Sequence, residues 1–151
     1  MDATNQHAVK VLNTLIETTL DSANGYEEAA QNANSGQLKT LFSERSRRRL
    51  DLSRQLQQEV RTFGGEPETE QSTLGKAHNK FVDIKNAIMG GGSETAVIDE
   101  VERGEDFIKG KYEAALRDED LPQNVRQLVS QAYESIRADH DEISAMKHAR
   151  H

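Results

Sequence analysis

Apolar side chains recur at alternating spacings of three and four residues in four long segments, 5–33, 37–63, 94–117 and 122–148. This spacing places them along one face of an α-helix and predicts four amphipathic helices, each with a buried stripe that we call its seam. The seam of the first segment is Val9, Leu12, Ile16, Thr19, Ala23, Tyr26, Ala30 and Ala33. The seam of the third is Ile98, Val101, Glu105, Ile108, Tyr112 and Ala115.

Polar residues interrupt the seams of the other two segments. The seam of the second is Leu38, Phe42, Arg45, Arg49, Leu52, Leu56, Glu59 and Phe63. The seam of the fourth is Val125, Val129, Ala132, Ile136, His140 and Ile143. Two arginines, a glutamate and a histidine therefore stand where the helical period calls for apolar side chains.

The lengths of the connections predict how the helices are joined. Short breaks separate the first segment from the second and the third from the fourth, so each pair should form an antiparallel hairpin. The link between the pairs is about 30 residues long and carries a shorter helical pattern at 73–89. Two hairpins joined by one long crossover are typical of ferritin-like folds. The sequence predicts a single all-α domain over 1–151, an up-down four-helix bundle whose crossover carries a short extra helix.

Composition narrows the class of protein. Hydrophobic residues make up only 34% of the chain and the net charge is −7, which suits amphipathic helices and disfavours binding to nucleic-acid phosphates. No apolar run approaches the ~18 residues of a membrane span, and the first residues lack the layout of a signal peptide. The absence of cysteine suits a reducing compartment. We therefore expect a cytoplasmic protein without nucleic-acid or membrane partners.

The histidines do not complete the ligand pattern of a di-metal bundle. In such bundles Glu-x-x-His pairs bind one ion because positions three apart share a helix face. Arg137 stands three residues before His140, and no glutamate stands three residues before any other histidine. The full motif is absent. His7, His148 and His151 lie near the chain ends, where we expect no functional role.

Several short motifs nevertheless give the chain a family resemblance. They are "GYEEAA" (25–30), "FGGEP" (63–67), "GKAHNKFVDIK" (75–85), "ERGED" (102–106), "LP" (121–122) and "HDE" (140–142). With these motifs the chain resembles, over nearly its whole length, a bacterial ferritin-like four-helix-bundle family catalogued as domain of unknown function 2383. The resemblance implies the ferritin-like fold and carries no assigned activity.

The resemblance also brings in the ligand positions of the wider ferritin-like superfamily. There, ligand glutamates on the first and third helices precede a tyrosine by seven residues. Glu105 stands seven residues before Tyr112 and matches this pattern. Thr19 stands seven residues before Tyr26, so the first helix has lost its carboxylate.

The second and fourth helices depart further from the superfamily pattern. The resemblance places Arg49 and Leu52 at the Glu-x-x-His positions of the second helix, and Arg137 and His140 at those of the fourth. Of the six ligand positions only Glu105 and His140 keep a metal-binding residue type. Two of the losses are to arginine.

Arginine at these positions suggests how a buried glutamate is neutralised. An isolated ionised carboxylate is very costly in a medium of low dielectric constant, and the guanidinium fork matches a carboxylate. We therefore expect a buried polar layer in place of a di-iron centre. Its predicted members are Arg49, Glu105, Arg137 and His140, with Arg45 and Glu59 as flanking polar contacts.

These observations predict a non-catalytic, stress-associated bundle protein without a cofactor. It would act by self-association, as a homo-oligomer such as a dimer, or by binding an unknown protein partner. The alternative is a divergent ferritin-like metalloprotein that binds iron or another divalent metal, or performs oxidation, with Glu102, Glu105 and His140 as candidate ligands. A metal held between subunits by surface carboxylates also stays open.

Three narrower functions are weighed against this prediction. A phosphoacceptor role for His140 is disfavoured because its sequence neighbours are acidic. An anion or nucleic-acid patch at Arg47 and Arg48 is disfavoured by the acidic balance of the chain. A small-molecule or lipid site beneath the apolar face of 73–89 stays open.

Overall fold

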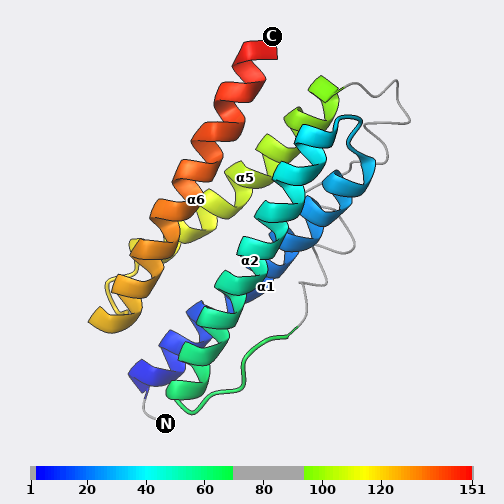
Figure 1. Ribbon diagram of the computed structural model, residues 1–151. Coiled ribbons are helices and arrows are strands. Elements are labelled where there is room, and N and C mark those ends of the chain that lie inside the picture. Colours follow the sequence, from blue (N-terminus) through cyan, green and yellow to red (C-terminus); the bar gives the residue numbers. More distant parts are fainter. Residues whose placement is uncertain (1–2, 70–93, 151) are drawn as a thin grey trace.

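The computed structural model describes residues 3–69 and 94–150, which form four helices (Figure 1). These are α1 (Ala3–Asn32), α2 (Gly36–Thr62), α5 (Glu94–Leu116) and α6 (Gln123–Arg150). Each begins and ends within two residues of the segment that the apolar spacing defines. The described ranges contain no strand, and the predicted all-α four-helix bundle is confirmed. The helical pattern at 73–89 lies outside the described residues.

Two antiparallel hairpins make up the bundle. α1 and α2 form one, α5 and α6 form the other, and α1 packs against α5. Figure 1 shows that α2 ends and α5 begins at opposite ends of the bundle, so these two helices run parallel. This is the helix order of a bundle with one long crossover connection. Across the remaining side, α2 and α6 are bridged by charged side chains.

Local signals fix both ends of α2. Ser35 caps its start, because its hydroxyl accepts a hydrogen bond from the N–H of Leu38 at 3.1 Å. Beyond the helix, Gly64 adopts a φ of 79°, which a residue without Cβ reaches without strain. The N–H of Gly65 then donates to the carbonyl of Val60 at 3.0 Å and closes the helix end.

The loop that follows α2 lies directly on α1. A Cβ added at Gly65 would come 2.9 Å from the methyl groups of Val9, so the close approach depends on glycine. Asn13 holds the same loop with both ends of its amide. It donates to the carbonyl of Glu66 at 3.0 Å and accepts from the N–H of Glu68 at 2.9 Å. The "FGGEP" stretch thus ties the end of α2 to the first half of α1.

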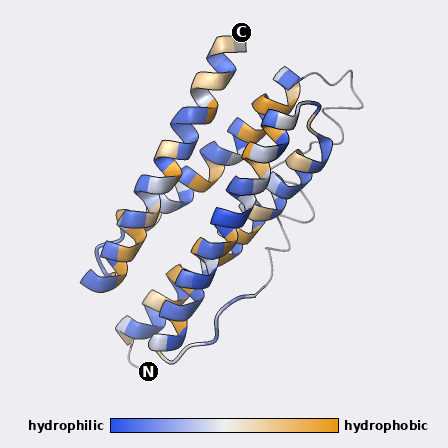
Figure 2. Cartoon of the chain, in the orientation of Figure 1, coloured by the Kyte–Doolittle hydropathy of each residue, from blue (hydrophilic) through white to orange (hydrophobic). Residues whose placement is uncertain are grey.

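The core is an apolar cluster to which all four helices contribute. All six seam positions of α5 are buried. Figure 2 shows hydrophobic and hydrophilic residues side by side along each helix, as expected of amphipathic elements. Over 3–69 and 94–150, none of the helices has an apolar stretch that could cross a bilayer.

The buried stripe of α2 departs from its predicted seam beyond Arg49. Ser53 and Val60 are buried, whereas Leu52 and Glu59 are only partly so. An α-helix has 3.6 residues per turn and drifts about 20° per heptad relative to the strict three–four alternation. The later seam positions are therefore rotated towards the surface, and the prediction that Glu59 lies on the buried face is wrong.

The buried stripe of α6 differs from its predicted seam at one position. It consists of Val125, Val129, Ala132, Ile136, Asp139 and Ile143. After Ile136 the stripe continues three residues on, at Asp139, and His140 lies beside it at the edge of the core. This shift of one residue changes which charged groups enter the bundle.

Candidate functional site

The centre of the bundle contains a buried ion pair between Arg49 of α2 and Glu105 of α5. Their side chains are 2% and 1% exposed. Arg49 Nη1 lies 2.8 Å from Glu105 Oε1, and Nη2 donates to Oε2 at 2.9 Å. Two parallel contacts of this kind are the strongest geometry for an arginine and a carboxylate. Both oxygens of Glu105 therefore contact one guanidinium.

The same guanidinium also binds the other two helices. Arg49 Nη1 donates to the hydroxyl of Ser22 on α1 at 2.6 Å. Its Nη2 donates to Asp139 Oδ2 on α6 at 3.2 Å. One side chain of α2 is thus hydrogen-bonded to side chains of α1, α5 and α6. These bonds oppose sliding of the four helices along one another.

The carboxylate of Asp139 contacts three arginines of α2. Besides its contact with Arg49, its Oδ1 accepts from Arg48 Nη2 at 3.0 Å and lies 3.5 Å from Nε of Arg45. Arg45 is buried and donates to Glu142 Oε1 at 2.8 Å. Among the described residues, Arg45 Nε is the one buried side-chain nitrogen or oxygen without a hydrogen bond, and the nearby Asp139 carboxylate balances its charge.

The buried charges of this layer cancel. Arg45 and Arg49 carry two positive charges, and Glu105 and Asp139 carry two negative charges. Burial works to lower the pKa of Arg49, but the carboxylate of Glu105, with contributions from Tyr26 and Asp139, outweighs it and raises the pKa above its ordinary value. The guanidinium therefore stays charged, as a buried carboxylate partner requires. We call Arg45, Arg49, Glu105 and Asp139 the ion-pair layer.

Tyr26 covers one side of the ion-pair layer. Its ring centroid lies 5.7 Å from the guanidinium carbon of Arg45 and 5.4 Å from that of Arg49, within the range of cation–π attraction. Its hydroxyl accepts a hydrogen bond from Arg45 Nη1 at 3.4 Å. Burial, followed by the charge of Glu105, raises the pKa of Tyr26 well above its ordinary value. The neutral ring thus packs against the two buried guanidinium groups.

A second tyrosine, Tyr112 of α5, is hydrogen-bonded to Thr19 of α1. The hydroxyl of Thr19 donates to the carbonyl of Leu15 at 2.6 Å, so Tyr112, 2.7 Å away, donates to Thr19. Burial raises the pKa of Tyr112 to about 12. This neutral pair completes the polar centre of the bundle.

These residues do not fit the di-metal centre of the wider superfamily. Thr19 uses its hydroxyl within the protein, and both oxygens of Glu105 are paired with Arg49. The donor set of the centre is therefore that of an ion-pair network.

Three predicted members of the layer lie elsewhere. Arg137 is exposed and pairs with Glu134 on its own helix at 2.9 Å, contrary to the prediction, because the residue next to a seam position faces solvent. Glu59 accepts a hydrogen bond from Asn124 at 3.3 Å in an exposed contact. His140 lies at the edge of the core.

His140 is paired with two exposed carboxylates, one on α5 and one on its own helix. Its Nε2 lies 2.5 Å from Asp106 Oδ1, and its Nδ1 lies 3.2 Å from Asp141 Oδ1. Burial works to lower the pKa of His140, but the hydrogen bonds to the two carboxylates raise it above its ordinary value. The histidine therefore joins α6 to α5 at the surface.

The three candidate metal ligands of the sequence each have a different partner. Glu102 accepts from Lys147 Nζ at 2.8 Å, Glu105 pairs with Arg49, and His140 pairs with Asp106. Within the described ranges they do not form a group whose ligand atoms converge. The structure thus gives these residues separate roles.

Asp139 is the residue of the layer that the sequence prediction missed. Its signal was present in the spacing. From Val125 the steps are four, three and four residues, and continuing the alternation reaches Asp139, whereas choosing His140 repeats a step of four.

The family comparison confirms the resemblance found in the sequence. The model of a family described as domain of unknown function (DUF2383) matches residues 7–118. No curated protein matches the chain. The matched residues cover more than half of the chain and include Arg49 and Glu105, whereas Asp139 lies beyond them. The chain belongs to the domain of unknown function 2383 family.

Proposed function

We propose that the protein is a non-catalytic four-helix bundle that acts by self-association, with the ion-pair layer in place of a di-metal centre. The observation that carries the proposal is the pairing of both Glu105 oxygens with Arg49. A metal oxidase needs carboxylate oxygens that are directed at an ion. In this bundle the central carboxylates are directed at permanent cations of the chain.

The ion-pair layer favours a structural role for a second reason. Buried ion pairs add little net stability compared with apolar packing, but breaking one strands a charge. Because Arg49 contacts all three other helices, sliding one helix along its neighbours would leave several buried charges without partners. The layer therefore specifies one arrangement of the bundle, which a protein that presents a fixed surface requires.

The face between α2 and α6 supplies a surface for a second copy. Two hollows of about 270 and 460 Å³ lie along it. Leu52 and Leu128 line the first, and Leu41 and Met146 line the second, all only partly buried. Apolar side chains exposed along one face favour contact with a partner.

Charges at the rim of this face suit contact between identical chains. Arg48, Glu44 and Glu142 are exposed there, so both signs are present on one surface. In a two-fold contact the same patch meets itself, and a patch with both signs can place opposite charges together. We therefore propose a homodimer through the α2–α6 face.

Sedimentation or light scattering of the purified protein over a range of concentrations tests self-association. The wild type should form dimers, and Leu128→Lys should shift the population to monomers with unchanged helical content. Leu20→Lys makes the same change at a partly buried position of α1 outside these hollows, and should leave the dimer intact. A wild type that stays monomeric at every concentration overturns the proposal.

Metal analysis tests the non-catalytic part separately. Protein produced with added iron and purified without chelator should contain no ion that depends on the centre of the bundle. Near-stoichiometric iron, manganese or zinc that disappears in the Glu105→Ala, His140→Ala double variant, while circular dichroism shows that this variant is still folded, would show a metal bound at the centre of the bundle. It would overturn the proposal whatever the state of association.

A further inference from the structure

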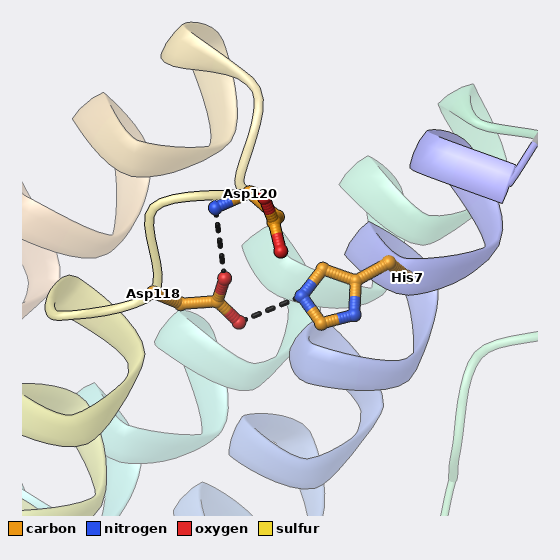
Figure 3. Close-up of side chains that lie close together, drawn as sticks. All are labelled: His7, Asp118 and Asp120. Atoms are coloured by element: carbon orange, nitrogen blue, oxygen red, sulfur yellow. Dashed lines mark hydrogen bonds and ion pairs between the residues drawn. The ribbon is translucent and has the colours of Figure 1, made fainter.

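A second cluster of charged side chains lies at one end of the bundle, away from the ion-pair layer. Figure 3 shows His7 of α1 directed towards Asp118 and Asp120 in the loop after α5. His7 Nε2 lies 2.7 Å from Asp118 Oδ2. One ligand atom from each of the three residues lies within 4.8 Å of the others. In 3–69 and 94–150 this is the one group of three such residues that could hold an ion.

The loop that carries the two aspartates is held in place. Asp118 Oδ1 accepts the N–H of Asp120 at 3.0 Å, which leaves Oδ2 facing the imidazole (Figure 3). Arg126 of α6 donates to the carbonyl of Leu116 at 2.6 Å and also to that of Asp118. Contacts that orient a ligand and its backbone are the usual support of a protein metal site.

The three donors define the kind of ion that fits. One imidazole nitrogen and two carboxylate oxygens suit Zn²⁺ and neighbouring divalent transition metals, whereas Ca²⁺ and Mg²⁺ favour oxygen alone. Three protein ligands leave room for water in a tetrahedral shell. The side chains of His7 and Asp118 are 38% and 23% exposed, so an ion can enter from solvent.

We propose that His7, Asp118 and Asp120 bind one divalent transition-metal ion of the Zn²⁺ class. The ion would replace the proton shared between His7 and Asp118 and add Asp120 to the contact. It would join the first turns of α1 to the loop between α5 and α6, segments 111 residues apart in sequence. Because the unfolded chain does not hold these groups together, binding should stabilise the folded protein.

The local charge includes opposing contributions. Lys10 and Lys111 line a hollow of about 300 Å³ beside His7 and Asp118, and their charges work against a cation. The loop contributes three adjacent acids, Asp118, Glu119 and Asp120. Direct ligation by two of these acids acts over shorter distances than the exposed lysines do, and therefore dominates.

His140 supplies a matched comparison within the same chain. It also contacts two aspartates, but Asp106 lies at Nε2 and Asp141 at Nδ1. Two carboxylates on different nitrogens of one ring lie on opposite sides of it, so they cannot share an ion with that histidine. One histidine and two aspartates are thus arranged convergently at His7 and divergently at His140.

Titration calorimetry of tag-free, chelator-treated protein with ZnCl₂ tests the proposal. The wild type should bind one ion per chain. His7→Ala and Asp120→Asn should each weaken binding roughly tenfold or more. His140→Ala and His148→Ala should bind as the wild type does. Asp120 is exposed, so its variant should fold even if the His7 variant does not, and circular dichroism checks both.

Thermal unfolding provides the second measurement. Zn²⁺ should raise the Tm of the wild type and of His140→Ala, and should not raise that of His7→Ala or Asp120→Asn. Wild-type protein without measurable binding overturns the proposal. So does binding that survives both His7→Ala and Asp120→Asn, or binding that His140→Ala abolishes. The result is independent of the dimer, because these ligands lie outside the two hollows of the α2–α6 face.

Discussion

Carboxylates meet different partners in the ion-pair layer and in the cluster at the end of the bundle. In the layer, Glu105 and Asp139 face guanidinium groups that are charged at every relevant pH and are themselves buried. At the end, Asp118 faces a half-exposed imidazole whose lone pair a metal can use as well as a proton can. The first arrangement contains its own cations, and the second can take one from solution.

The difference teaches that the position of a carboxylate decides what must neutralise it. A carboxylate in the core needs a counter-charge in every folded molecule, and in this bundle arginine supplies that charge. A carboxylate at the surface is hydrated, so it is stable without a bound ion. The two clusters should therefore respond to mutation and to added metal in opposite ways.

The largest effect is expected from Glu105→Ala. Removing this carboxylate leaves Arg49 buried with Asp139 and Ser22 alone, and should cost on the order of 3–5 kcal/mol of unfolding free energy. Denaturant unfolding measures the loss. Asp106→Ala, at an exposed neighbouring position, should have a far smaller effect. Equal losses in the two variants would contradict a special role for the buried pair.

The pairing itself is tested by a double-mutant cycle. Arg49→Leu should destabilise strongly because it strands Glu105, and the double change Arg49→Leu, Glu105→Leu should recover much of the loss. We expect a coupling free energy of roughly 1–3 kcal/mol from denaturant unfolding of the four proteins. Additive single effects would show that the two side chains do not depend on each other.

Asp139 and Arg137 separate the observed layer from the predicted one. Asp139→Asn keeps the shape but removes the charge that three arginines of α2 face, and should cost about 1–3 kcal/mol. Arg137→Ala should change the unfolding free energy by no more than about 0.5 kcal/mol, because its side chain is exposed. A larger loss from Arg137→Ala than from Asp139→Asn would instead support the predicted layer of Arg137 and His140.

The smallest effect concerns pH and His140. Its pKa in the folded protein is raised above 6.5, so the stabilisation from its protonated form is present below pH 6.5 and is lost as pH rises through the folded pKa. Wild type should exceed His140→Gln in stability on the acidic side, by less than about 1 kcal/mol, and the difference should shrink on the alkaline side. His148→Gln, at an exposed position, serves as the control.

The absence of that shrinkage would mean that Asp106 and Asp141 do not hold the imidazole in solution. The pairs at this surface are then weaker than those of the ion-pair layer by more than exposure alone explains. Thermal or denaturant unfolding at several pH values, with the carboxylates still ionised, gives the comparison.

The fold followed from the sequence because its signal is local. The helices repeat apolar residues over many turns, and the lengths of the breaks determine which helices form hairpins. The pair of Arg49 and Glu105 was also accessible, since both interrupt otherwise apolar seams. Where the period was followed through, as on α5, every expected position is buried.

The wrong predictions of buried positions arose from the ligand pattern of the resemblance and from an idealised helical period. Arg137 was placed by the ligand pattern of the resemblance, and His140 was placed on the seam by a second step of four residues where a step of three reaches Asp139. Glu59 was placed by a strict alternation that a straight helix leaves after several turns. The cluster at His7 could not be foreseen, because it depends on which end of α1 meets the loop after α5. No local pattern encodes that meeting.

The participation of Asp139 has a consequence for the folding unit. The family match ends at Asp118, before α6 begins. A chain cut there would keep Arg45 and Arg49 of the ion-pair layer but only one of the layer's two carboxylates, Glu105. Helices α1, α2 and α5 therefore cannot complete the ion-pair layer by themselves. A unit that contains the whole ion-pair layer has to extend through the middle of α6.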